Sequence, residues 1–146
     1  MIRRSIVVRV APEVAFRVFT ERTDLWWPRD HRPMGRADAR LSLEPGVGGA
    51  LAERSDDGAE VLLGRVLAWD PPNALALAFF PGSGPASPTR VDVRFSTVEE
   101  GTRVEVEHGP GELSRERFEG TAPRFDRNWE LLLRHLAERC EDATSH

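Results

Sequence analysis

The sequence predicts an α+β domain in which a curved antiparallel sheet wraps around a long C-terminal helix. Two observations lead to this fold class. Apolar residues recur along 115–141 at helical spacing, and six short segments with strand-like composition fill the middle of the chain between turn signals. A chain of 146 residues favours one domain, so we expect a single unit over 1–146 with one core.

The first quarter of the chain predicts one strand followed by two short helices. Residues 2–10 are rich in β-branched side chains, which is typical of a strand. Pro12 suits the first helical position of the segment that follows. A second short helix is expected over 23–27, because Thr23 can cap it and Pro28 discourages its continuation. The polar, proline-containing stretch 28–37 then reads as a loop.

Six strands follow, and their alternation predicts which face is buried. The expected segments are 38–43, 49–55, 60–70, 74–80, 89–98 and 102–108. Alternation is clearest in the last two, where the inward set comprises Val91, Val93, Phe95, Val104, Val106 and His108. Segment 60–70 is apolar at both its odd and its even positions, so the sequence does not decide which of its two faces is buried. Glu53, Arg65 and Asp92 would face inward only if their strands had the opposite register.

The C-terminal helix carries the longest apolar stripe in the sequence. Its members are Phe125, Trp129, Leu132, Leu133, Leu136 and Cys140. Gly120 and Pro123 predict irregular first turns, and 142–146 is expected to fray. This stripe is long enough to cover the apolar face of the sheet, so the space between helix and sheet becomes either packed core or a ligand cavity.

Composition excludes several functional classes. The formal net charge is −4, which argues against a nucleic-acid binder. No apolar run reaches the ~20 residues of a membrane span, and the basic N-terminus lacks the apolar stretch of a secretory signal. The single cysteine, Cys140, fits a reducing cytoplasm. We therefore expect a cytoplasmic protein without a membrane or nucleic-acid partner.

Large side chains on the inward faces form the candidate ligand-binding site. These residues are Trp26, Trp27, Phe79, Phe95, His108, Phe118, Phe125, Trp129 and Leu133. His108 is the only titratable group on the inward parity of its strand. It could act as a hydrogen-bond anchor or proton donor, or it could be a strand-end histidine bonded to the backbone.

Other chemistry has little support in the sequence. The four histidines show no paired spacing with each other or with Cys140, so no metal and no cofactor are predicted. Ser83 lies between two glycines in a Pro/Gly loop, which is not a nucleophile elbow. Cys140 falls on the apolar stripe and is expected to be an inert buried thiol.

A series of motifs in order along nearly the whole chain resembles a known family. The motifs are the helix start at 11–20, Leu-Trp-Trp-Pro at 25–28, Gly-Gly at 48–49, Gly-Arg-Val at 64–66 followed by Asp-Pro-Pro at 70–72, Gly-Thr-Arg-Val at 101–104, and Asn-Trp-Glu-Leu-Leu-Leu-Arg-His-Leu at 128–136. They resemble the bacterial activator-of-heat-shock-ATPase-like family of the START-like superfamily, whose relatives include polyketide cyclases and the birch-pollen-allergen fold. The resemblance implies a helix-grip fold with an apolar cavity under the long helix.

Three functional hypotheses remain at this point. The first is a binding protein that holds a small apolar or aromatic molecule between the sheet and helix 115–141. The second is an enzyme of the cyclase, aromatase or hydrolase type that uses His108 in the same cavity. The third is a co-chaperone-like protein-interaction module, as the family name suggests. The formation of a homodimer is left open.

Overall fold

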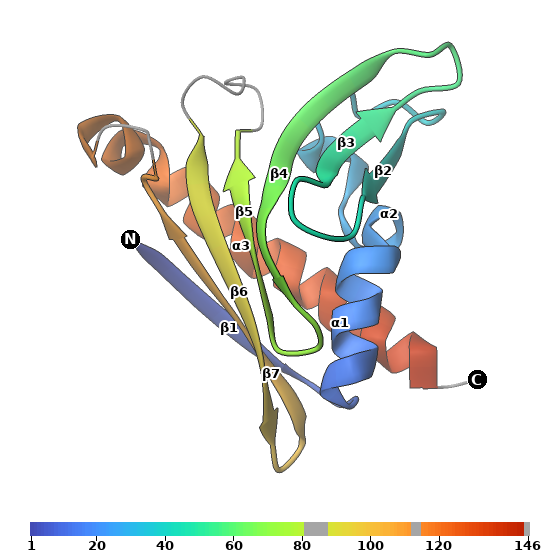
Figure 1. The fold of residues 1–146 in the computed structure, drawn as a ribbon, viewed down its shortest axis with the longest axis vertical. Helices are drawn as coiled ribbons and strands as arrows, with labels where there is room; N and C mark the ends of the chain where they lie inside the picture. The colour runs from blue at the N-terminus through green and yellow to red at the C-terminus, as the bar shows by residue number, and fades with distance from the viewer. Residues whose placement is uncertain (81–87, 112–114, 145–146) are drawn as a thin grey trace.

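The computed structural model describes residues 1–80, 88–111 and 115–144 and confirms the predicted α+β, helix-grip architecture (Figure 1). Seven antiparallel strands form one curled sheet in the order β1-β7-β6-β5-β4-β3-β2. The strands are β1 (Ile2–Val8), β2 (Arg40–Leu43), β3 (Ala50–Arg54), β4 (Glu60–Asp70), β5 (Ala74–Phe79), β6 (Thr89–Val98) and β7 (Gly101–Gly109). The helices are α1 (Pro12–Glu21), α2 (Thr23–Trp26), the 3-10 turn η1 (Arg29–His31) and α3 (Arg115–Thr144).

The sequence predicted that the first strand ends at residue 10, but the strand ends at Val8. Val8 pairs with Thr102 at the last rung of the β1–β7 ladder. Beyond it the chain turns toward α1, and the Val10 carbonyl accepts a hydrogen bond from the Thr102 hydroxyl at 2.8 Å. The backbone carbonyl of Val8 would lie only 2.2 Å from a Cβ on Gly101, so this corner requires glycine.

Helix α1 begins at Pro12, as predicted, and buries one face against the sheet. Ala15, Phe16, Val18 and Phe19 have at most 5% of their surface exposed. The hydroxyls of Thr20 and Thr23 each donate to the carbonyl four residues earlier, at 2.8 Å. These bonds satisfy carbonyls at the junction of α1 and α2, where the regular ladder stops.

Strands β6 and β7 have the predicted facing. Val91, Val93, Val104, Val106 and His108 are fully buried, whereas Arg90, Arg94 and Arg103 are exposed. Along strand β4, the inward-facing residues change from one alternating set to the other. Its pairing shifts register against β3 between Leu51 and Ala52, and against β5 between Val66 and Ala68. Bulges of this kind reverse the face that later residues occupy, which is why the sequence left this strand undecided.

Helix α3 lies across the inner face of the sheet (Figure 1). The predicted stripe is correct: Trp129, Leu132, Leu133, Leu136 and Cys140 are all buried. The predicted irregular first turns are wrong, because the helix runs unbroken from Arg115 through Pro123 to Thr144. Of the tail 142–146 that was expected to fray, residues 142–144 are helical, and 145–146 lie outside the described residues. Within the described chain no helix has the length and apolar character of a membrane span.

An ion pair ties α3 to the edge of the sheet. The Arg4 guanidinium on β1 donates to both carboxylate oxygens of Asp126, with Nε–Oδ1 and Nη2–Oδ2 distances of 2.8 and 2.9 Å. These hydrogen bonds lower the pKa of Asp126 and raise the pKa of Arg4. Both side chains are more than a third exposed, so water screens the ion pair. The pair therefore mainly orients the helix.

Candidate functional site

Six of the predicted site residues form one aromatic cluster between α3 and the sheet. The members are Trp27, Phe79, His108, Phe118, Phe125 and Trp129, each in ring contact with at least two of the others. The closest pair is His108 and Phe125, with ring centroids 4.4 Å apart. All members except Phe125 are buried. Side chains therefore fill this part of the space that the sequence left open between core and cavity.

His108 stands at the centre of this cluster and has no exposed surface. Trp129 Nε1 lies 3.1 Å from His108 Nδ1, and Thr89 Oγ1 lies 2.8 Å from His108 Nε2. An indole N–H can only donate, so Nδ1 must be the unprotonated acceptor. His108 is therefore the Nε2-protonated tautomer and donates to Thr89.

The hydrogen bonds continue from Thr89 to the backbone of β5. The Thr89 hydroxyl donates to the Phe79 carbonyl at 2.7 Å. One chain of donors thus runs from the Trp129 indole through the His108 ring and the Thr89 hydroxyl to Phe79. Every buried polar atom in it has a partner, which is what an apolar surrounding requires.

Burial lowers the pKa of His108 to about 3, and the N-terminal ammonium adds a smaller effect in the same direction. An imidazole surrounded by aromatic rings cannot be solvated as a cation, so the neutral form is favoured. His108 is therefore neutral at pH 7, with both nitrogens already engaged. Binding a polar group of a ligand or transferring a proton therefore requires His108 first to give up its bond to Trp129 or to Thr89.

The other three predicted site residues lie next to the cluster. Trp26 contacts Trp27, with centroids 5.4 Å apart, and its indole donates to the Phe19 carbonyl. Phe95 packs edge-on against Phe16 and Phe19 of α1. Leu133 is buried one helical turn after Trp129. Trp26 and Trp27 are core residues in this conformation, at 1% and 4% exposure.

Sequence reasoning missed Thr89, the hydroxyl partner of His108. The signal was present, because Thr89 precedes Val91 by two residues and so shares its inward parity. A polar residue at the start of an otherwise apolar inward face indicates a buried hydrogen bond. Thr89 accepts the Nε2 hydrogen bond of His108 and belongs to the candidate site.

Of the three polar residues considered for an opposite register, only Glu53 is buried. Arg65 is exposed, and Asp92 accepts hydrogen bonds from Arg90 on the outer face. Glu53 has no exposed surface, and its carboxylate oxygens accept from the backbone N–H groups of Met34 and Gly35 at 2.8 and 3.2 Å. Glu53 therefore anchors the loop 28–39 and does not face the aromatic cluster.

A buried arginine holds the other end of the same loop. The Arg32 guanidinium is 1% exposed, donates to the Trp27 carbonyl and pairs with Asp24 at 2.7 Å. Trp27 in turn donates from its indole to the His31 carbonyl at 3.1 Å. This network fixes the position of Trp27, which forms one wall of the aromatic cluster.

Replacing Glu53 with glutamine should lower the free energy of unfolding by about 1.5–3 kcal/mol, the range for hydrogen bonds to a charged group. The amide can still accept one hydrogen bond, but its NH2 would face the second backbone donor. Urea denaturation measures this loss. Glu99→Gln in the exposed turn between β6 and β7 serves as the control and should cost less than about 0.5 kcal/mol. Equal stability of the two variants would show that Glu53 does not anchor the loop.

Metal and nucleophile chemistry gain no candidate from the described residues. No three histidine, cysteine or acidic side chains among them are grouped so that they could hold a metal ion. Cys140 is fully buried, as predicted, and desolvation raises the pKa of its thiol to about 12. Ser83 lies outside the described residues.

The fold is shared with solved structures that differ widely in sequence. A protein from Mesorhizobium loti has 20% identity and a TM-score of 0.67, with 98% of this chain and 97% of that chain covered. The Aha1 dimer from Colwellia psychrerythraea has 19% identity and a TM-score of 0.68, with 96% and 95% covered. At these identities the likeness concerns the fold alone.

One structural match has higher identity over a shorter region. An anthrahydroquino-γ-pyrone synthase, solved in complex with a ligand, shares 35% identity and a TM-score of 0.54, with 75% of each chain covered. A comparison with curated proteins finds no match. The family model described as activator of Hsp90 ATPase homolog 1-like protein matches residues 9–141. That match spans nearly the whole domain and agrees with the sequence motifs and the helix-grip fold, so the chain belongs to the activator of Hsp90 ATPase homolog 1-like family.

Proposed function

We propose that the protein binds a flat apolar or aromatic small molecule between α3 and the sheet, in contact with His108. The observation that carries this proposal is the buried neutral imidazole surrounded by aromatic rings. Ligand sites are mostly apolar with a few placed polar groups. His108 and Thr89 are the polar groups here, and the rings of the cluster would stack on the ligand.

Entry of a ligand requires the aromatic cluster to open, and the N-terminal part of α3 is the segment best suited to move. Pro123 lacks the N–H that would bond to the Glu119 carbonyl, and Gly120 weakens the same turns. Only Phe118 and Phe125 of this segment reach the cluster. Outward movement of these two rings would expose the His108 side of the cluster while Trp129 stays in place.

The 35% identical synthase favours a second candidate, an enzyme of the cyclase type that works on polycyclic aromatic substrates. His108 would then serve as general acid or base after ligand binding breaks its bond to Trp129 or Thr89. The low pKa of His108 argues for the binding role, because a proton-transfer group works best with a pKa near the operating pH.

A titration with 1,8-dihydroxyanthraquinone tests the proposal, and mass spectrometry of small molecules released from the purified protein supports it independently. We expect binding that His108→Asn weakens by at most about tenfold, since one neutral hydrogen bond is worth about 0.5–1.5 kcal/mol. The control is Glu119→Gln, an exposed change on α3 that should leave affinity unaltered. The binding function would be contradicted if the dye did not bind and no small molecule were released from the purified protein.

The same variants separate binder from enzyme. Loss of general acid–base catalysis lowers turnover by about 10²–10⁴-fold. Consumption of an aromatic polyketide-like substrate that disappears in His108→Asn, with dye affinity largely retained, would establish the enzyme instead.

The protein-interaction function, the homodimer and the cytoplasmic location stay predictions. Large apolar side chains that are exposed in the described chain are Met1, Val7, Leu25, Val47 and Leu67. Val7 lies on β1, Leu25 on α2 and Leu67 on β4, whereas Met1 and Val47 lie outside the helices and strands. Light scattering on the purified protein measures the oligomeric state directly.

A further inference from the structure

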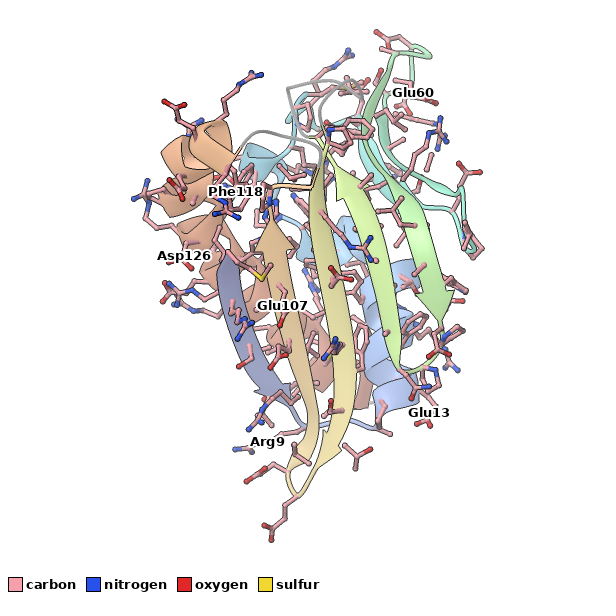
Figure 2. The ribbon with its side chains drawn as sticks, turned by 60° about the vertical axis from the view of Figure 1, so that its left-hand side comes forward. Arg9, Glu13, Glu60, Glu107, Phe118 and Asp126 are labelled. Atoms are coloured by element: carbon pink, nitrogen blue, oxygen red, sulfur yellow. The ribbon has the colours of Figure 1, made fainter. Side chains whose placement is uncertain are left out.

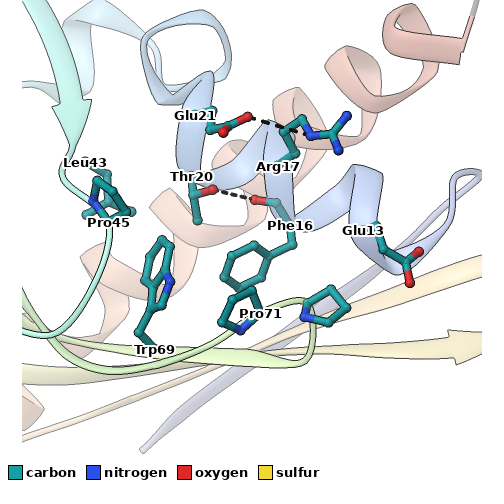
Figure 3. Close-up of a pocket in the computed structure, with 10 residues that line it drawn as sticks. Glu13, Phe16, Arg17, Thr20, Glu21, Leu43, Pro45, Trp69 and Pro71 are labelled. Atoms are coloured by element: carbon teal, nitrogen blue, oxygen red, sulfur yellow. Dashed lines mark hydrogen bonds and ion pairs between the residues drawn. The ribbon is translucent and has the colours of Figure 1, made fainter.

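An apolar hollow lies beside α1, outside the aromatic cluster. It has a volume of about 500 Å³, within the range of small-molecule sites. Phe16 of α1, Trp69 at the end of β4 and the Pro71–Pro72 turn line its floor, and Leu43 and Pro45 line the side formed by β2 (Figure 3). We call this hollow the α1 groove.

Two aromatic faces in the α1 groove are held rigidly. Phe16 and Trp69 meet edge to face with centroids 5.2 Å apart. Phe16 is also fixed from behind by Phe95, again at 5.2 Å. Figure 3 shows the Trp69 ring between Pro45 and Phe16. Faces of this kind attract apolar groups and, through the ring quadrupole, organic cations.

Trp69 differs from the other three tryptophans in its indole N–H. Trp26 donates to the Phe19 carbonyl, Trp27 to the His31 carbonyl and Trp129 to His108. Trp69 Nε1 has no acceptor among the residues that the structure describes, and it is not a buried unsatisfied atom. This donor is therefore open to solvent and available to a ligand oxygen.

The charged residues around the α1 groove favour a ligand of positive charge. Its lining contains Glu13, Glu21 and Arg17, which sum to one net negative charge. Arg17 pairs with Glu21 at 3.7 Å. Glu13 makes no ion pair within the described chain, so its carboxylate remains uncompensated at the rim. A cation placed there gains a partner, whereas an anion meets a like charge.

We propose that the α1 groove is a second binding site, for an organic cation with an aromatic or apolar body and an oxygen acceptor. The body lies against Phe16, Trp69 and the proline turn. The Trp69 indole donates to the ligand oxygen, and Glu13 meets the cationic group. This site is separate from the cluster around His108, because Glu13 and Phe118 lie at opposite ends of the sheet (Figure 2).

Three probes that share a phenoxyethyl group and differ in charge test the proposal. They are choline phenyl ether, a permanent cation, with neutral 2-phenoxyethanol and anionic 3-phenoxypropanoate as its matched partners. Each carries a phenyl ring and an ether oxygen. The readout is the indole N–H region of a ¹H–¹⁵N spectrum, in which Trp69→Phe identifies the Trp69 signal.

We expect the cation to shift the Trp69 signal and to bind about threefold to tenfold more tightly than the neutral probe, with the anion weakest. Glu13→Gln should weaken cation binding about threefold and leave the neutral probe unchanged. The matched control is Glu119→Gln, which removes the same charge from the exposed surface of α3.

Any of four outcomes would overturn the proposal. The Trp69 signal could stay unmoved by every probe at millimolar concentration. The three probes could bind equally, or Glu13→Gln could act no differently from Glu119→Gln. A shift of the Trp129 signal without one at Trp69 would place the probe in the His108 cluster and would also contradict a separate site.

Discussion

Replacing Trp129 with alanine is expected to lower the free energy of unfolding by about 3–5 kcal/mol, the range for large aromatic residues in cores. Trp129 is 2% exposed and contacts Trp27, Phe79 and His108. The change leaves a cavity and also removes the donor to His108 Nδ1. A loss of this size is a large share of the 5–15 kcal/mol typical of a domain.

Urea denaturation of Trp129→Ala beside Trp129→Phe divides this loss into two parts. Phenylalanine keeps most of the ring packing but cannot donate to His108, so it should cost about 1–3 kcal/mol for the unsatisfied acceptor. A loss below about 1.5 kcal/mol for the alanine variant would show that Trp129 is not packed core. The cluster would then be already open to solvent.

Stability should also fall by about 2 kcal/mol between pH 7.5 and pH 5 because of His108. The pKa of His108 is about 3 in the folded protein, against 6.5 for an ordinary histidine. In this pH range the unfolded chain gains a proton that the folded chain excludes. The stabilisation is therefore complete above about pH 6.5 and is lost as pH falls toward 3, with a slope of up to about 1.4 kcal/mol per pH unit.

The measurement is urea unfolding at several pH values for the wild type and for His108→Asn. The variant loses stability at every pH, but its slope above pH 5 should be smaller by the His108 contribution. Comparing slopes removes the effect of the other titrating groups, which both proteins share. Equal slopes would mean that His108 titrates normally in the folded state and is solvated there.

The sequence predicts most of the fold because the decisive patterns are long or repeated. The α3 stripe spans four turns, and the alternation in β6 and β7 places His108 inward without ambiguity. The facing of β4 could not be predicted. Its Leu63 and Val66 are both buried although they lie three residues apart, because the pairing register shifts along the strand.

The candidate site was predictable in membership but not in detail. Parity and size select the aromatic residues, whereas the tautomer of His108 depends on contacts between α3, β6 and β7 that no local pattern encodes. The buried role of Glu53 was likewise hidden, because its partners are backbone groups about twenty residues earlier. The α1 groove depends on the meeting of α1 with two turns, and no motif marks it.

The chain of hydrogen bonds through His108 has a consequence for how α3 docks. An interface made only of leucine and phenylalanine tolerates small slides of a helix, since one apolar contact replaces another at little cost. The Trp129 indole can reach His108 Nδ1 in one helix position only. A slide along the axis or a rotation of α3 would strand two buried polar atoms at once. This single polar contact therefore selects one alignment of helix and sheet from many that would bury the same apolar area.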